Sequence, residues 1–153
     1  CALPISSDWR VSGIVSARSG SWLTVTSGRN SFNGLGGTAG LRVNQISDQV
    51  YGPKTLLAYL NRDAFSQPAV GEFGNHQLNS IRGPGFWKID LALSRLFALS
   101  GTQNIEARLE AFNLLNNFNW GNPIVNLSSG NFGRIQSAAG DQRILQFGIK
   151  YAF

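Results

Sequence analysis

The chain has 153 residues and a formal net charge of +5, but only 14% of its residues are charged. Lys and Arg form no run and no patch interleaved with aromatic residues, which excludes nucleic-acid binding. No apolar stretch is long enough for a membrane-spanning helix, and one cysteine cannot form an internal disulfide. The 18 glycines and 11% aromatic residues are typical of strands and loops, so we predict an all-β fold.

The first predicted strand covers about residues 8–28. Successive side chains of a strand point to opposite faces, so alternation separates two surfaces. The odd positions that begin at Trp9 are apolar, whereas the even positions include Arg10 and Arg18 and have Ile14 as their exception. One face of this strand is therefore apolar and the other is mostly polar.

The second and third predicted strands run from about residue 86 to 99 and from about 104 to 118. Their odd positions are mostly apolar and their even positions mostly polar or charged. Arg95 breaks this rule, and we expect its long side chain to point outward and reach lipid headgroups. Strands of this length are about twice the mean of globular proteins and match what a tilted strand needs to cross a bilayer.

A short connection joins these two strands, which predicts a hairpin. A turn at residues 101–103 would pair Ser100 with Asn104 and keep the even positions of both strands on one face. The register expected from this turn places Ser94 opposite Glu110 and Ala98 opposite Glu106.

The fourth predicted strand covers about residues 143–153 and alternates without a break. Its apolar row ends on Tyr151 and Phe153. An aromatic carboxyl terminus preceded by this row resembles the signal that the bacterial barrel-assembly machinery reads. In a soluble sandwich the row would face a core, and in an outer-membrane barrel it would face lipid.

Charged residues at even positions predict a ladder of mixed sign along the lumen of a barrel, with pairing across strands. General acid/base catalysis of the glycosidase type is the alternative for the carboxylates. Neighbouring cations favour the ladder, and we expect no catalytic residue, cofactor or metal. The ladder comprises Lys88, Asp90, Glu106, Arg108, Glu110 and Lys150, with Arg10 and Arg18 on the first strand.

Two long connections, residues 29–85 and 119–142, contrast with the short hairpin turn. Short turns at one rim and long loops at the other are the outer-membrane pattern. Residues 34–37 are glycine-rich and indicate a flexible loop, and His76 has no partner at ligand spacing, so we interpret it as a solvated loop residue. Aromatic residues near the predicted strand ends indicate girdles at the two membrane interfaces: Trp9, Trp22, Phe86, Trp87, Phe118 and Trp120.

Several short stretches recur in a known order. They read DWRVSGI at 8–14, NRDAF at 61–65, GEFGN at 71–75, RGPG at 82–85, IDLALSR at 89–95, RLEAFNLLN at 108–116 and QFGIKYAF at 146–153. This ordered series resembles the carboxyl-terminal part of a TonB-dependent outer-membrane receptor of the Oar-like kind, a family with a large barrel and an amino-terminal plug.

The resemblance implies that residues 1–153 are a piece of a transmembrane β-barrel: four long antiparallel strands, the end of a fifth at residues 1–5, and long extracellular loops. Alone, the piece would form a curved open sheet. The absence of Met and the start at Cys1 agree with a piece.

The implied function is wall of a TonB-dependent transporter for a scarce large solute of the siderophore, cobalamin or glycan class. The implied partners are outer-membrane lipid, the barrel-assembly machinery and the TonB complex, which a preceding plug would contact. The implied location is the bacterial outer membrane, with the carboxyl terminus at the periplasmic side. Two alternatives stay open: a passive or adhesive outer-membrane barrel, and a soluble β-sandwich that binds carbohydrate.

Overall fold

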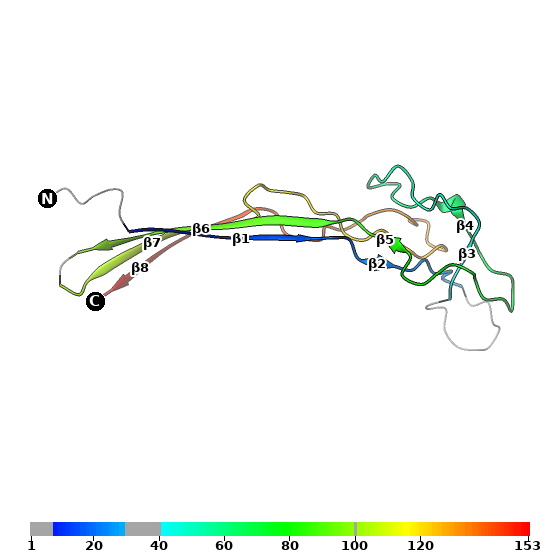
Figure 1. Ribbon diagram of the computed structural model, residues 1–153, viewed down its shortest axis with the longest axis horizontal. Helices are drawn as coiled ribbons and strands as arrows, with labels where there is room; N and C mark the ends of the chain where they lie inside the picture. The colour runs from blue at the N-terminus through cyan, green and yellow to red at the C-terminus, as the bar shows by residue number, and fades with distance from the viewer. Residues whose placement is uncertain (1–7, 30–40, 100) are drawn as a thin grey trace. The chain divides into compact units, whose positions relative to one another are not determined.

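The computed structural model describes residues 8–29, 41–99 and 101–153, and its fold is all-β as predicted (Figure 1). No helix in these ranges is long and apolar enough to cross a membrane. Three predictions lie outside the described residues: the end of a fifth strand at residues 1–5, the flexible loop at 34–37, and the conformation of Ser100. The elements are β1 (Trp9–Arg18), β2 (Trp22–Leu23), β3 (Asn44–Gln45), the 3-10 turn η1 (Arg62–Ala64), β4 (Phe65–Ser66), β5 (Ile81–Arg82), β6 (Phe86–Ala98), β7 (Asn104–Phe112) and β8 (Ile144–Ala152).

The chain divides into two compact units, which are described separately. The sheet unit comprises Cys1–Arg18, Trp87–Phe118 and Asp141–Phe153. The loop unit comprises Ser19–Phe86 and Asn119–Gly140, which are nearly the two long connections foreseen from the sequence.

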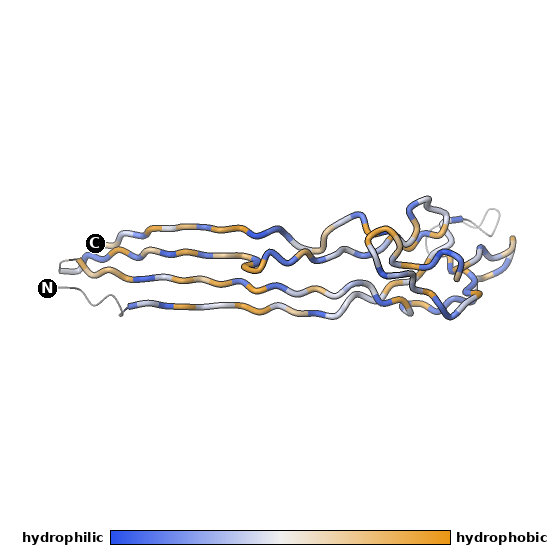
Figure 2. Tube along the Cα trace, turned by 90° about the horizontal axis from the view of Figure 1, so that it is seen from above, coloured by the Kyte–Doolittle hydropathy of each residue, from blue (hydrophilic) through white to orange (hydrophobic). Residues whose placement is uncertain are grey.

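The sheet unit is one antiparallel sheet with the strand order β1-β6-β7-β8. The second and third predicted strands form the expected hairpin, β6–β7, and hydrophobic and hydrophilic residues alternate along all four strands (Figure 2). The sheet does not close on itself, since β1 and β8 stand at its two edges. An open four-stranded antiparallel sheet is the expected fold class.

The register of the β6–β7 hairpin differs from the prediction by two residues. Asn104 pairs with Ala98, and Ser94 lies opposite Arg108 instead of opposite Glu110. The expected pair of Ala98 with Glu106 is therefore also wrong. The connection is wider because the backbone N–H of Leu99 donates to the Gln103 carbonyl at 3.0 Å and Gly101 takes a positive φ of 63°. A shift of two residues keeps every side chain on its predicted face, so the assignment of residues to the two faces is unchanged.

Two strands end earlier than predicted. The first predicted strand leaves the long sheet after Arg18, and β2 pairs instead with β5, with Trp22 opposite Arg82. The third ends at Phe112, because Asn113 turns the chain with a positive φ of 51°. Neither turn leaves a mark on the alternation, since both follow an otherwise regular run.

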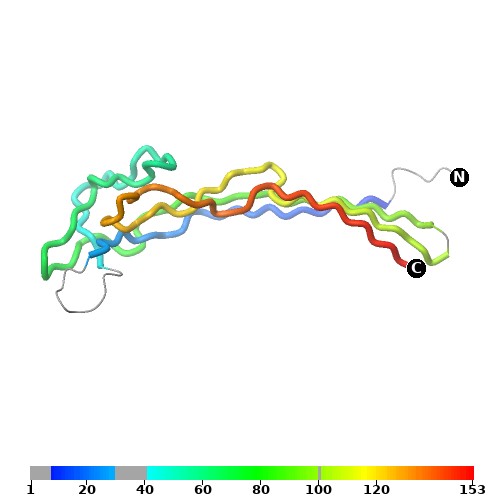
Figure 3. Tube along the Cα trace, turned by 180° about the vertical axis from the view of Figure 1, so that it is seen from behind, coloured from blue at the N-terminus to red at the C-terminus, as the bar shows by residue number. Residues whose placement is uncertain are grey.

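The loop unit has a hydrophobic core of its own. Both segments contribute to it, and Figure 3 shows the cyan-to-green segment beside the orange one. The two long connections therefore pack together over their described residues. Burial of this core is the main stabilising term for the unit. Its buried members are Val25, Val43, Tyr59, Leu60, Ala64, Phe65, Ile81, Leu127, Phe132 and Ile135.

Hydrogen bonds also join the two segments of the loop unit, 19–86 and 119–140. The Arg62 guanidinium donates to the carbonyls of Leu127 and Ser129 at 2.9 and 3.1 Å. The Gly133 carbonyl accepts from the Tyr59 N–H at 2.8 Å, and a Cβ at Gly133 would lie 2.7 Å from the Leu60 carbonyl oxygen. Close backbone contact of this kind requires glycine there.

Candidate functional site

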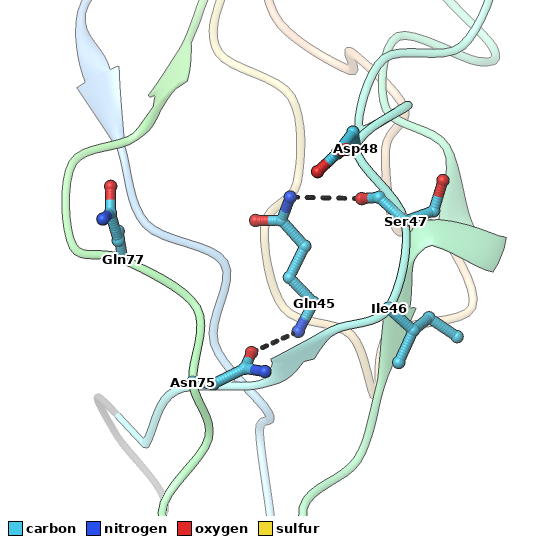
Figure 4. A pocket seen from close by; sticks show the side chains of 6 residues that line it. All are labelled: Gln45, Ile46, Ser47, Asp48, Asn75 and Gln77. Atoms are coloured by element: carbon cyan, nitrogen blue, oxygen red, sulfur yellow. Dashed lines mark hydrogen bonds between the residues drawn. The ribbon is translucent and has the colours of Figure 1, made fainter.

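A polar pocket lies in the loop unit, where residues after β3 face the segment that precedes β5. Its volume is about 530 Å³, which is within the range of ligand pockets. Five of its six lining side chains are polar, in contrast to the apolar lining of most such sites. Figure 4 shows all six: Gln45, Ile46, Ser47, Asp48, Asn75 and Gln77.

Hydrogen bonds hold the floor of this pocket. The Asn75 side-chain oxygen accepts from the backbone N–H of Gln45 at 2.7 Å, and the Asn75 N–H donates to the Asn44 side chain at 3.1 Å. The Gln45 amide nitrogen donates to the Ser47 carbonyl at 3.1 Å, as the dashed line in Figure 4 marks. Two distant segments are thus fixed in place before any ligand arrives.

His76 supports the pocket from behind. The expectation of a solvated histidine is wrong, because only 1% of the residue is exposed. Its Nδ1 lies 3.0 Å from the Gln45 Oε1, its Nε2 lies 3.2 Å from the Ser80 hydroxyl, and its ring meets that of Phe65 edge to face. Burial, with the nearby Arg42 cation, lowers the pKa of His76 below its ordinary value. The side chain is a neutral core residue of the loop unit.

The predicted charged ladder lies on one face of the sheet. Glu106 is opposite Lys150, and Glu110 is opposite Gln146, which places the even positions of β7 and β8 together. Two ion pairs of the ladder run along single strands. Lys88 Nζ lies 2.7 Å from Asp90, and Arg108 lies 3.6 Å from Glu110.

Asp90 also fixes the turn that ends β7. One of its carboxylate oxygens accepts from the Asn113 N–H at 2.8 Å, while the other contacts Lys88. The buried Asn113 side chain then donates to the carbonyls of Asn117 and Asp141 at 2.9 and 3.0 Å. These contacts join β6, the turn after β7 and the start of β8. Asp90 therefore has a structural role that its position in the alternation did not reveal.

A second, smaller pocket of about 240 Å³ lies on this charged face. Ile14 and Phe112 line it together with Asp90, Arg108 and Glu110. These two apolar side chains interrupt the polar alternation of this face, as Leu96 and Ile144 also do.

The opposite face of the sheet is apolar and exposed. Val15 is 72% exposed, and Phe147 and Ile149 are each 66% exposed. Exposed apolar surface of this extent marks contact with another apolar phase or partner. The larger exposed members of these rows are Trp9, Val11, Val15, Trp87, Leu91, Leu109, Leu145, Phe147, Ile149 and Tyr151.

Two aromatic rings lie beside Arg95, a cation in this apolar row. The Arg95 guanidinium lies 5.2 Å from the ring centroid of Trp9 and 4.7 Å from that of Phe97. A cation over an aromatic face is stabilised where water is scarce. Trp120 differs from the other predicted girdle residues, because it packs against the core of the loop unit.

The last residues extend the apolar row beyond β8. The Tyr151 and Phe153 rings stack with centroids 5.9 Å apart, and Phe153 is 91% exposed. Both rings are accessible to a partner that reads the end of the chain.

Comparison with protein families gives one match. The family model described as an outer membrane beta barrel domain matches residues 4–146, which is nearly the whole chain. No curated protein and no solved structure matches the chain.

Proposed function

Because the chain belongs to the outer membrane β-barrel domain family, we propose that it forms part of the wall of a TonB-dependent transporter of the bacterial outer membrane. The complete transporter takes up a scarce solute that is too large for porins, of the siderophore, cobalamin or glycan class. Energy from the inner membrane reaches it through TonB. The chain itself supplies wall, outer loop surface and an assembly signal, and it has no catalytic role.

The folded loop unit supports a solute-specific transporter in preference to a barrel of general function. A connection that only joins two strands needs few residues, whereas these two connections build a core with ten buried members. A folded surface with a preformed polar pocket suits capture of a specific solute. The ordered motifs shared with TonB-dependent receptors support the same function.

The proposed orientation starts from a carboxyl terminus on the periplasmic side. If β8 descends to a periplasmic carboxyl terminus, β6 also descends, and β1 and β7 ascend. Both long connections then lie outside the cell, and the charged face of the sheet lines the lumen. The apolar rows contact outer-membrane lipid, Tyr151 and Phe153 bind the barrel-assembly machinery, and a plug domain contacts TonB.

A passive or adhesive barrel is the rival function. The family match and the exposed apolar rows favour either membrane barrel over a soluble β-sandwich. Dependence on energy separates the two barrels, because a passive pore conducts without it.

Uptake by whole cells tests the proposal. Radiolabelled ferrichrome, cyanocobalamin and maltohexaose are supplied to the parent strain, to a strain lacking the gene and to a strain lacking TonB. We expect accumulation of one probe to require both the gene and TonB, and to stop when a protonophore is added.

Two results would contradict this expectation. Gene-dependent uptake that persists without TonB indicates a passive barrel. Failure of all three probes to depend on the gene, together with normal attachment of the parent strain and loss of attachment in the deletion strain, indicates an adhesin.

A further inference from the structure

The polar pocket of the loop unit has a lining that specifies a ligand class. We propose that it binds a neutral saccharide through hydrogen bonds to its hydroxyl groups. The inference rests on the proposed function, because it names the solute class that the outer loops capture.

The pocket presents side-chain amides that can donate and accept. A sugar hydroxyl also donates and accepts, so amides match it in either direction. Gln45 and Asn75 are already fixed by the hydrogen bonds described above, which lowers the entropy lost when a ligand is ordered. The buried His76 behind Gln45 holds the Oε1 of that amide in place.

Asp48 and Gln77 complete the pocket with polar groups that are still available. Neither side chain forms a hydrogen bond or ion pair within the described part of the chain, whereas those of Gln45 and Asn75 do. In the view of Figure 4 they lie on either side of the Gln45 amide. Exposed and unpaired groups that converge on a pocket are free to exchange their water for a ligand.

The charge of the lining decides against an anionic solute. None of the six lining residues is a cation, and Asp48 places a carboxylate at the pocket. Asp48 would repel a phosphate, a uronic acid or an anionic iron chelate, and such a ligand would find no Arg or Lys among the lining residues. A carboxylate that accepts from hydroxyl groups suits a neutral polyol.

Binding to the complete protein, purified from outer membranes in detergent, tests this inference. Isothermal titration uses six-unit malto-, cello-, xylo-, manno- and chito-oligosaccharides, with hexagalacturonate as the anionic counterpart. We expect at least one neutral oligosaccharide to bind and hexagalacturonate not to bind.

Variants on two different segments assign the binding to this pocket. Asp48→Ala and Gln77→Ala should each weaken binding by roughly tenfold, because each removes a direct hydrogen bond to the ligand. Glu72→Ala and Gln49→Ala remove the same groups from exposed positions outside the lining and should leave the affinity unchanged.

Three results would overturn the inference: no neutral oligosaccharide binds, hexagalacturonate binds more tightly, or both pocket variants bind like the parent. The uptake experiment separates this inference from the proposed function. TonB-dependent uptake of ferrichrome or cyanocobalamin without saccharide binding refutes only the saccharide site. Saccharide binding that needs Asp48 and Gln77, without TonB-dependent uptake, refutes only the transporter.

Discussion

His76 shows how a polar side chain can serve as core. Both of its ring nitrogens have partners, Gln45 and Ser80, so its burial leaves no polar atom unsatisfied. This role could not be predicted from the sequence, because the Gln45 partner lies 31 residues from His76 along the chain. From sequence alone, a single histidine among polar neighbours is predicted to be solvated, because its hydrogen-bond partners become visible only in the folded structure.

The lowered pKa of His76 predicts acid sensitivity of the loop unit. The unfolded chain takes up a proton near the ordinary value of 6.5, at a higher pH than the folded chain does. The stabilising contribution is therefore complete above about pH 6.5 and is lost as the pH falls toward the folded pKa. Hydrogen exchange at pH 7.5 and 5.5, corrected for intrinsic rates, should show loss of protection around residues 41–45 and 76–81.

A variant isolates the histidine from other titrating groups. His76→Gln should lower stability by about 1–3 kcal/mol at pH 7.5, because buried partners lose their hydrogen bonds. It should also flatten the dependence on pH. Equal loss of protection at low pH in the parent and in His76→Gln would assign the acid sensitivity to another titrating group. In the hydrogen-exchange experiment, peptides from β8 serve as the internal reference.

At the scale of elements, Asn113 joins the turn after β7 to β6 through its backbone N–H and to the segment before β8 through its side chain. Asn113 has a positive φ of 51°, which asparagine tolerates better than other residues with a Cβ. Its Oδ1 accepts from the Asn117 N–H at 2.9 Å, in addition to the two carbonyls that its amide group reaches.

Replacement of Asn113 should therefore weaken the whole sheet. Asn113→Ala loses buried hydrogen bonds and adds strain at positive φ, for a total of about 2–4 kcal/mol. Asn113→Gly loses the same hydrogen bonds without the strain and should cost less. Urea unfolding of the complete protein in lipid vesicles measures both, and equal losses would mean that backbone strain contributes nothing.

Alternation along β8 predicts which face tolerates charge. Phe147 lies on the exposed apolar row and pairs with Leu109, whereas Gln146 lies on the opposite face and pairs with Glu110. In a membrane, Phe147→Arg should cost about 2–4 kcal/mol, because it places a cation against lipid. Gln146→Arg should cost little beside Glu110.

The same urea unfolding experiment compares these neighbouring substitutions. A larger loss for Gln146→Arg than for Phe147→Arg would show that the assignment of the two faces is reversed.

The separation of the two faces could be predicted because it depends on local alternation, and the β6–β7 hairpin could be predicted because its connection is short. The register of the β6–β7 hairpin could not, because alternation repeats every two residues and permits every even shift. The actual pair, Ala98 with Asn104, depends on how the backbone turns at Gly101. Likewise, Asp90 reads as a ladder charge in the sequence, and only the fold reveals its bond to the Asn113 N–H.

At the scale of the whole molecule, the proposed assembly signal at Tyr151 and Phe153 can be tested directly. Phe153 is highly exposed and stacks on Tyr151, so its replacement removes no core contact. Phe153→Ala should reduce the amount of assembled barrel several-fold while leaving the stability of the molecules that do assemble unchanged. Heat-modifiable migration on gels measures the assembled fraction.

Phe73→Ala provides the control for this experiment. Phe73 is also an exposed phenylalanine, but it belongs to the loop unit. Equal loss of assembled barrel in both variants would mean that the terminal aromatic residue carries no special signal.

The compact loop unit and its polar pocket were not foreseen. The core of the loop unit joins residues as far apart as Val25 and Ile135, and no repeating pattern along the chain predicts this contact. The pocket likewise joins the Gln45 and Asn75 segments, neither of which carries a recognisable motif. Long-range packing of irregular segments leaves less trace in a sequence than strand alternation does.

The separate hydrophobic core of the loop unit has an evolutionary consequence. All ten of its buried members come from Ser19–Phe86 and Asn119–Gly140, and none comes from the four long strands. If the loop unit binds a solute and the sheet contacts lipid, as proposed above, selection for recognition and selection for membrane packing act on separate sets of residues. Substitutions that change the binding surface then leave the lipid-facing rows intact.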